Sequence, residues 1–170
     1  RDVERSRGLG DVYKRQISNL VAMRETEGSN IYGDFIKRAD LIAEKLAVIE
    51  ERSPQVVEEY QIRLSDRINE LLAKHNQVIE PERLLQEVAI FADRTSITEE
   101  IVRLKSHIKQ FKLIIDADQP VGRKLDFLIQ EFNREANTIA SKANDYTLAQ
   151  VVVEIKAEIE KIREQIQNIE

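Results

Sequence analysis

The chain has 170 residues, of which 42% are hydrophobic, 34% are charged and 5% are aromatic, with five Gly and three Pro. This composition is typical of long amphipathic helices and argues against a β-sandwich or barrel. The absence of Cys excludes disulfides and thiolate zinc sites and fits a cytoplasmic protein, and no apolar run approaches the roughly 20 residues of a membrane span. Because the formal net charge is −5, a polyanion would need a local basic surface or bound cations.

The first 30 residues differ from the rest of the chain. Residues 1–16 have poor helical periodicity, and residues 11–16 read as the translation of a transposon end used in making sequencing libraries. We therefore expect 1–16 to be an adapter-derived or disordered arm, with a basic arm that binds nucleic acid as the alternative. Residues 17–30, which end in the turn-prone Glu27-Gly28-Ser29-Asn30, are interpreted as the remnant of a truncated upstream domain.

Residues 31–82 are predicted to form a helical hairpin. Apolar residues recur every three or four positions between Asp34 and Arg52, which predicts the first helix. Ser53-Pro54 predicts a break, because Ser caps helices and Pro suits the first helical position. The second helix carries an apolar stripe that reaches His75, which we interpret as a packed histidine at the helix end.

Residues 83–170 are predicted to form a C-terminal helical domain. Ser96-Ile97-Thr98-Glu99 reads as a capping box, in which the Glu99 side chain accepts a hydrogen bond from the Ser96 amide. A tight connection is expected at 116–120, and the apolar stripes alternate steps of four and three. The predicted fold is all-α, an elongated helical bundle with long antiparallel hairpins and a coiled-coil-like last helix. A helix is expected from Pro81 to about 93–95, apolar stripes over 97–115, 121–139 and 148–169 mark three more helices, and Asn144-Asp145 separates the last two.

One group of side chains stands out in this domain. Glu100 and His107 share one flank of the apolar stripe of their helix, and Glu131 and Glu135 share the corresponding flank of the partner. In an antiparallel hairpin folded about Asp118, His107 is expected level with Glu131, and Glu100 level with Glu135. The group could bind a divalent cation or act as a general acid and base. The alternative is an interhelical salt-bridge network, which would involve two cationic side chains of the same helices, Arg103 and Lys142.

A second feature is an amide-rich stripe that lies near Asp126. Asn is a poor helix former, so the stripe either contacts nucleotides or a neighbouring subunit, or is a polar face bonded within the bundle. Cationic side chains of the same region could hold phosphates. The predicted RNA-binding residues are Arg103, Arg123, Lys124, Gln130, Asn133, Arg134, Asn137 and Lys142.

Long stretches of the sequence resemble the YicC/YloC family. They are EVAIFADR at 87–94, ITEE and RLKSH at 97–107, VGRKLDFLIQEFNREANTIASK at 121–142, and the ending at 154–170. Weaker similarity reaches back to about Leu20. The resemblance implies a bacterial, cytoplasmic endoribonuclease that depends on manganese or magnesium and assembles as a ring-like hexamer, with RNA as its substrate.

Two functional hypotheses follow. In the preferred one, a cation bound by His107, Glu131 and Glu135 assists the hydrolysis of RNA phosphodiester bonds, and Glu100 is a fourth ligand or the base. These four residues are the candidate catalytic groups, assigned from the hairpin geometry. In the alternative, the chain is a non-catalytic oligomerisation or adaptor protein, a reading that the apolar stripe from Leu148 to Ile169 supports equally well.

Overall fold

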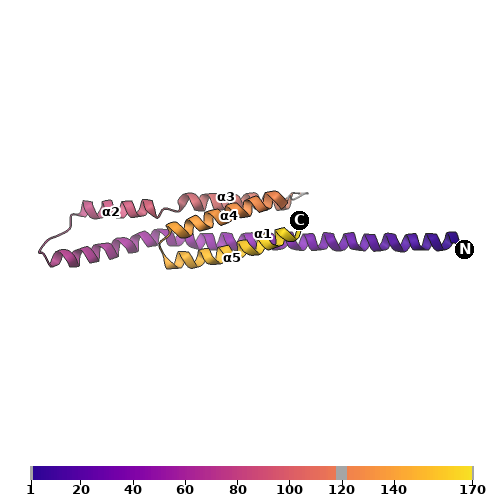
Figure 1. The fold of residues 1–170 in the computed structure, drawn as a ribbon. Coiled ribbons are helices and arrows are strands. Elements are labelled where there is room, and N and C mark those ends of the chain that lie inside the picture. Colours follow the sequence, from indigo (N-terminus) through magenta and orange to yellow (C-terminus); the bar gives the residue numbers. More distant parts are fainter. Residues whose placement is uncertain (1, 118–121, 170) are drawn as a thin grey trace. The chain divides into compact units, whose positions relative to one another are not determined.

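The computed structural model describes residues 2–117 and 122–169. Within these residues the chain forms helices and no strands, which confirms the predicted all-α class. The chain divides into two compact units, residues 1–37 and residues 38–170. The helices, labelled in Figure 1, are α1 (Asp2–Ala73), α2 (Pro81–Arg94), α3 (Thr98–Asp116), α4 (Gly122–Lys142) and α5 (Tyr146–Ile169).

The first unit contains the beginning of α1. Residues 2–16 are helical, so the expectation of a disordered arm was wrong, whereas an adapter origin stays a prediction. The turn expected at Glu27-Gly28-Ser29-Asn30 was also wrong, because α1 continues through it. A glycine inside a helix costs only about 1 kcal/mol, and each residue added to an existing helix gains one hydrogen bond. Isolated glycines such as Gly8, Gly10 and Gly28 therefore do not suffice to end α1.

The helical hairpin expected over 31–82, with its break at Ser53-Pro54, is not formed either, because Pro54 lies inside α1. Proline in a helix interior costs about 3 kcal/mol. Ile49 and Val56, on either side of Pro54, are both buried, so core packing on one face of α1 continues across the proline. This packing outweighs the local cost, and the helix is not broken.

The chain turns back instead at residues 74–80, between α1 and α2. Asn76 adopts a positive φ of 51°, in the left-handed region that turns require. Beyond the turn, the ring of Phe91 on α2 stacks on Tyr60 of α1, with centroids 3.7 Å apart. His75 lies in this turn and is exposed. The expectation that it packs at the end of a helix was therefore wrong, because α1 ends at Ala73, before the position of His75 on the apolar stripe.

The start of α3 also differs from the expected capping box. Ile97 is the N-cap residue, and neither Ser96 nor Glu99 caps the helix. The Ser96 hydroxyl lies 3.5 Å from the Thr98 hydroxyl, and Glu99 lies 3.7 Å from Arg103. Because the Ile97 side chain is 2% exposed, its burial fixes the entry to α3 one residue later than the box requires.

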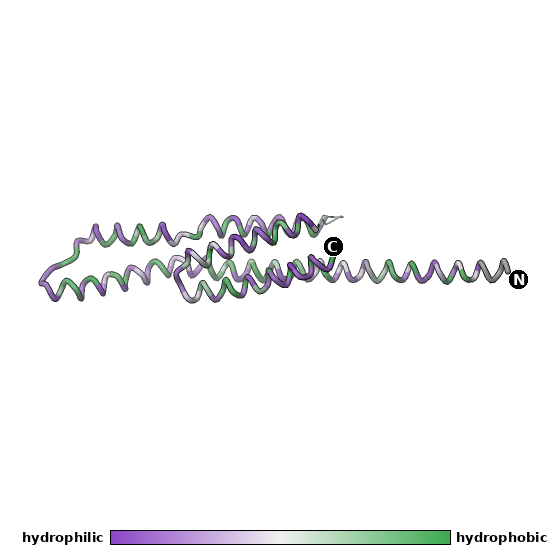
Figure 2. Tube along the Cα trace, in the orientation of Figure 1, coloured by the Kyte–Doolittle hydropathy of each residue, from purple (hydrophilic) through white to green (hydrophobic). Residues whose placement is uncertain are grey.

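The core of the second unit lies between α3, α4 and α5. The central helix α4 packs against both neighbours, as the two predicted antiparallel helix pairs require. Phe111 of α3 and Phe132 of α4 are fully buried, with ring centroids 5.5 Å apart. Hydrophobic positions recur along each of these helices between hydrophilic ones (Figure 2). The apolar stripe of α5 is buried within this unit at Leu148, Val152, Ile155, Ile159, Ile162 and Ile166.

The section of α1 from residue 38 onward is tied to α5 and α3 by ion pairs. On the α5 side, Arg38 lies 2.9 Å from Glu158, and Lys45 lies 2.9 Å from Glu154. On the α3 side, Lys105 pairs with Glu50, and Lys112 pairs with Asp40. The pattern aligns this section of α1 with both helices, and its apolar face, which includes Ile42 and Leu46, contributes to the core.

Asp145 joins the start of α5 to α1. Its Oδ2 accepts a hydrogen bond from the Leu148 amide at 3.0 Å, as an N-cap aspartate does, and its Oδ1 lies 3.1 Å from an Arg52 Nη. The hydrogen bonds from Arg52 lower the pKa of the Asp145 carboxyl, and this effect outweighs the opposing effect of burial. A carboxyl whose pKa is lower in the folded state stabilises the fold above its unfolded pKa of about 3.9, and this contribution is lost as the pH falls through the folded value.

We therefore expect Asp145→Asn to lower the free energy of unfolding by about 1–2 kcal/mol at pH 7, because a charge-assisted contact becomes a neutral one. Toward pH 2 the difference from the unsubstituted chain should shrink, because protonation of the Asp145 carboxyl removes the charge that the variant lacks. Urea unfolding followed by circular dichroism at the two pH values measures this change. Asp116→Asn, at an exposed position, is the control, and an equal loss of stability for Asp145→Asn at both pH values would contradict the expectation.

Candidate metal and RNA site

Three of the four predicted site residues converge between α3 and α4. His107 lies on α3, and Glu131 and Glu135 lie one turn apart on α4. Donor atoms of the three side chains all lie within 4.8 Å of one another. The Nε2 atom of His107 is 3.8 Å from Oε2 of Glu131. We call these three residues the His–Glu cluster. It forms because the antiparallel packing of α3 and α4 brings their equivalent flanks together, as the hairpin geometry predicts.

His107 is the least satisfied member of the His–Glu cluster. Both ring nitrogens are buried and have no hydrogen-bond partner among the described residues. A buried polar atom without a partner costs about 1–3 kcal/mol, and a bound ion or an ordered water would remove this cost. An imidazole nitrogen beside two carboxylates is a donor set that binds borderline divalent cations. The chemistry of the cluster therefore fits a divalent cation.

The size of the cluster is compatible with one ion. Nitrogen and oxygen ligands lie about 2.1 Å from a divalent transition metal, so two ligands of the same ion are at most about 4.2 Å apart. Separations of up to 4.8 Å require the side chains to move together slightly. Glu131 is 22% exposed and His107 19% exposed, so both can rotate at the rim of the bundle.

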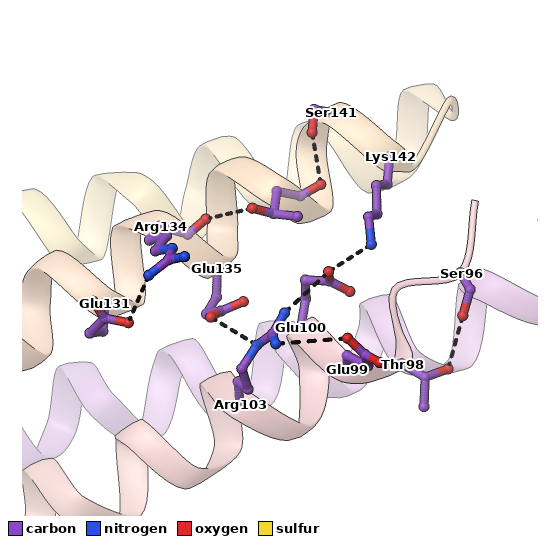
Figure 3. Close-up of polar contacts among 11 residues, drawn as sticks. Ser96, Thr98, Glu99, Glu100, Arg103, Glu131, Arg134, Glu135, Ser141 and Lys142 are labelled. Carbon is purple, nitrogen blue, oxygen red and sulfur yellow. Dashed lines mark hydrogen bonds and ion pairs between the residues drawn. The ribbon is translucent and has the colours of Figure 1, made fainter. Parts of the chain in front are cut away.

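A salt-bridge network adjoins the His–Glu cluster, as the alternative hypothesis predicts. Lys142 donates to Oε1 of Glu100 at 2.8 Å, and an Nη atom of Arg103 lies 3.4 Å from the same oxygen. The Nε atom of Arg103 lies 3.1 Å from Oε1 of Glu135. Figure 3 shows Arg103 between these two carboxylates. The cluster and the network coexist, and Glu135 is common to both.

Glu100 belongs to the network and lies outside the group of donor atoms that converge on His107. Burial acts to raise the pKa of its carboxyl, but the Lys142 hydrogen bond and the charges of Lys142 and Arg103 prevail and lower it. Glu100 is therefore a carboxylate at neutral pH although only 2% of it is exposed. Its Oε2 atom is buried without a hydrogen-bond partner among the described residues.

The expected alignment of Glu100 with Glu135 was wrong. Glu100 and His107 are seven residues apart, a helix rise of about 10 Å, whereas Glu131 and Glu135 are four apart, a rise of about 6 Å. If His107 is level with Glu131, Glu100 must lie nearly one turn beyond Glu135. The structure accordingly pairs Glu100 with Lys142 and places Arg103 beside Glu135. The roles of the four residues in catalysis stay a prediction.

Most of the predicted RNA-binding residues lie on adjoining exposed faces of α4, whereas Arg103 lies on α3. Arg123, Lys124 and Arg134 are exposed toward the α3 side, and Arg134 lies 3.9 Å from Glu131. The amide stripe, Gln130, Asn133 and Asn137, is also exposed, and it adjoins Arg123 and Arg134, because residues seven apart on a helix differ in direction by only about 20° and residues four apart by about 40°. Within the stripe, Gln130 donates to Asp126 at 3.2 Å. One strand bound along this surface could therefore reach cationic residues and part of the stripe together.

An exposed aromatic side chain at this site was missed by the sequence reasoning. Phe127 of α4 is 60% exposed, whereas the apolar stripe of the same helix is buried at Leu128 and Phe132. The signal was its position, because Phe127 falls outside the steps of three and four that define the stripe. An aromatic residue off the apolar face, next to Arg123 and Lys124, is a candidate binding residue.

None of the described helices combines the length and the apolar composition that crossing a bilayer requires.

The fold and the site together define an all-α bundle that carries a candidate cation site between two antiparallel helices. Residues 49–170 match the family model described as endoribonuclease YicC-like, C-terminal. The chain belongs to this YicC-like family, as the resemblance predicts.

Two curated relatives carry the name probable endoribonuclease YicC. The protein from Clostridioides difficile (strain 630) is 51% identical over 162 residues, which cover 95% of this chain and 55% of the relative. The protein from Haemophilus influenzae (strain ATCC 51907 / DSM 11121 / KW20 / Rd) is 36% identical over 165 residues, which cover 97% of this chain and 56% of the relative. The chain therefore spans about half the length of the curated relatives it matches.

Proposed function

We propose that this chain contains the cation site of an endoribonuclease that cleaves RNA phosphodiester bonds. The observation that supports the proposal most directly is the His–Glu cluster, in which a histidine with two unpartnered buried nitrogens faces two carboxylates. The names of the two relatives supply the reaction class. His107, Glu131 and Glu135 would hold the cation, which we propose to be manganese or magnesium.

The chain's own residues have distinct tasks in this proposal. A bound divalent cation supplies neutralisation of phosphate charge and lowers the pKa of bound water. Arg103 orients the Glu135 carboxylate through its Nε contact. Lys142 and Arg103 keep Glu100 ionised beside the cluster. Arg123, Lys124 and Arg134 bind the phosphates of the RNA backbone, as exposed cations do.

The adaptor hypothesis loses its main support in the structure. The α5 stripe that would offer an oligomerisation surface is buried against the chain's own core from Leu148 to Ile166. The ring-like hexamer and the cytoplasmic location implied by the family resemblance belong to the proposal for the intact protein. The amide stripe, Gln130, Asn133 and Asn137, is exposed and is proposed to contact RNA bases or sugars from the adjoining face of α4.

Cation binding can be tested without RNA. We expect manganese to raise the melting temperature of the chain, because a ligand present at 100 times its dissociation constant stabilises the folded state by about 2.7 kcal/mol. His107→Leu should abolish this rise. In chelator the variant should be as stable as the unsubstituted chain or more stable, because two unpartnered buried nitrogens are removed.

Differential scanning calorimetry with and without manganese measures both effects. His75→Leu is the matched control, because His75 is exposed in the turn before α2 and lies outside the His–Glu cluster. If His107→Leu retained the manganese-dependent rise, the proposed cation site would be wrong. If His107→Leu lost stability in chelator and no rise existed in the unsubstituted chain, His107 would be a structural residue only.

A further inference from the structure

We infer that the ring of Phe127 stacks on an unpaired base of single-stranded RNA. This base belongs to the nucleotide next to the one whose phosphate lies at the His–Glu cluster. The inference rests on the proposed function and adds the substrate class, single-stranded RNA. A base within a duplex is already stacked on its neighbours and therefore cannot stack on the Phe127 ring.

The first observation is the exposure of an aromatic ring on a helix that otherwise buries its apolar residues. Phe127 is 60% exposed, whereas Leu125, Leu128 and Ile129 around it are at most 3% exposed. The ring borders a cavity of about 270 Å³ between α3 and α4. The lining consists of Gln110, Ile114, Arg123, Lys124, Phe127 and Leu128. An open ring face beside a small cavity is suited to the flat face of a nucleobase.

The second observation is the charge of the lining. Arg123 and Lys124 lie one turn before Phe127 on α4, and no residue of this lining is acidic. In a chain with a net charge of −5, this local excess of positive charge favours a polyanion. An aromatic ring for the base with cations for the backbone is the combination by which proteins bind single-stranded nucleic acids. A protein partner would use the apolar part of this lining alone, whereas a single-stranded nucleic acid also uses the two adjacent cations, Arg123 and Lys124.

The third observation is that the cavity and the His–Glu cluster are neighbours. Gln110 lies almost one turn beyond His107 on α3, and Phe127 lies one turn before Glu131 on α4. The two pairs are therefore at adjacent levels of the same helix pair, with a rise of about 6 Å between Phe127 and Glu131. An RNA strand with one phosphate at the cluster would place the following or preceding nucleotide at Phe127.

The test measures RNA binding in chelator, so that cleavage does not contribute. The probe is a short single-stranded RNA with one 2-aminopurine base, whose fluorescence falls when the base stacks. We expect Phe127→Ala to weaken binding about tenfold and to abolish the fluorescence change. Phe127→Trp should retain both. Tyr146→Ala is the control, because Tyr146 is a 77% exposed aromatic residue on α5, away from the cavity. The same RNA annealed to its complement should bind Phe127→Ala and the unsubstituted chain equally.

Each outcome decides between the inference and the proposed function. Unchanged binding by Phe127→Ala, or an equal loss with Tyr146→Ala, would overturn the inference and leave cation-dependent cleavage to be judged separately. A loss confined to Phe127→Ala would support the inference, even if the chain showed no cleavage with manganese and the proposed function failed. If Phe127→Ala changed only the sedimentation of the chain and not its RNA binding, the ring would be a contact between copies, and the inference would be wrong.

Discussion

Replacing Glu131 with glutamine is expected to lower manganese-dependent RNA cleavage by at least about a hundredfold. The substitution removes one negative charge from the His–Glu cluster and keeps the shape of the side chain. Changes that leave the ligands intact and alter only their hydrogen-bond partners already cost 10- to 100-fold in metal affinity or activity, so the loss of a ligand should cost more. Cleavage of a labelled RNA, followed on denaturing gels over a series of manganese concentrations, measures the effect.

A matched control exists on α5. Glu160 lies 3.8 Å from Arg163 in the same helical spacing as Glu131, which lies 3.9 Å from Arg134. Glu160→Gln therefore removes one carboxylate charge and an ion pair of the same spacing, from a more exposed position outside the His–Glu cluster. Melting temperatures in chelator should be the same for both variants, since exposed ion pairs contribute little to stability. Cleavage by Glu131→Gln at the rate of Glu160→Gln would show that Glu131 has no catalytic role.

Replacing Phe132 with alanine is expected to have the largest effect on stability. Phe132 is fully buried at the centre of α4, where its ring lies 5.5 Å from that of Phe111. Removing a buried phenylalanine side chain costs about 3–5 kcal/mol, from lost burial and from the cavity left behind. For a chain of this size the melting temperature should fall by roughly 10 °C. Urea unfolding monitored by circular dichroism gives the free energy directly.

Phe127→Ala is the control for this prediction. It removes the same side chain from the same helix, but from a position that is 60% exposed, so the free energy of unfolding should change by less than about 0.5 kcal/mol. Equal destabilisation by the two substitutions would mean that the apolar face of α4 has been assigned wrongly. A small effect of Phe127→Ala would also show that its reduced RNA binding is not caused by unfolding.

The helices that carry the site were predictable because their sequences repeat one consistent pattern. The apolar stripes of α3, α4 and α5 place the boundaries within a few residues, and the grouping of His107 with Glu131 and Glu135 follows from spacing and antiparallel packing alone. Both depend on helix periodicity, which is fixed by backbone geometry. Backbone geometry does not determine how much tertiary packing surrounds a single helix breaker or N-cap residue.

The errors arose where tertiary packing competes with a local preference. Pro54 is a strong breaker by itself, yet buried residues on both sides of it keep α1 continuous. Ser96 is a good N-cap, yet the burial of Ile97 moves the start of α3. The link from Arg103 to both Glu100 and Glu135 depends on side-chain torsions that helical spacing does not determine. The level of Glu100 was predictable from the helix rise and was simply misjudged.

The ion pairs between α1 and α3 have a mechanical consequence for the imidazole of His107. Lys105 and Lys112, which pair with Glu50 and Asp40, lie on either side of His107 along α3. The 19-residue α3 is thereby fastened at two points to an uninterrupted helix of 72 residues. Movement of the section of α1 after residue 38 along its axis would break both ion pairs or shift α3, and with it His107, relative to Glu131 and Glu135 on α4. The same two ion pairs thus help to set the position of the imidazole opposite the carboxylates of Glu131 and Glu135.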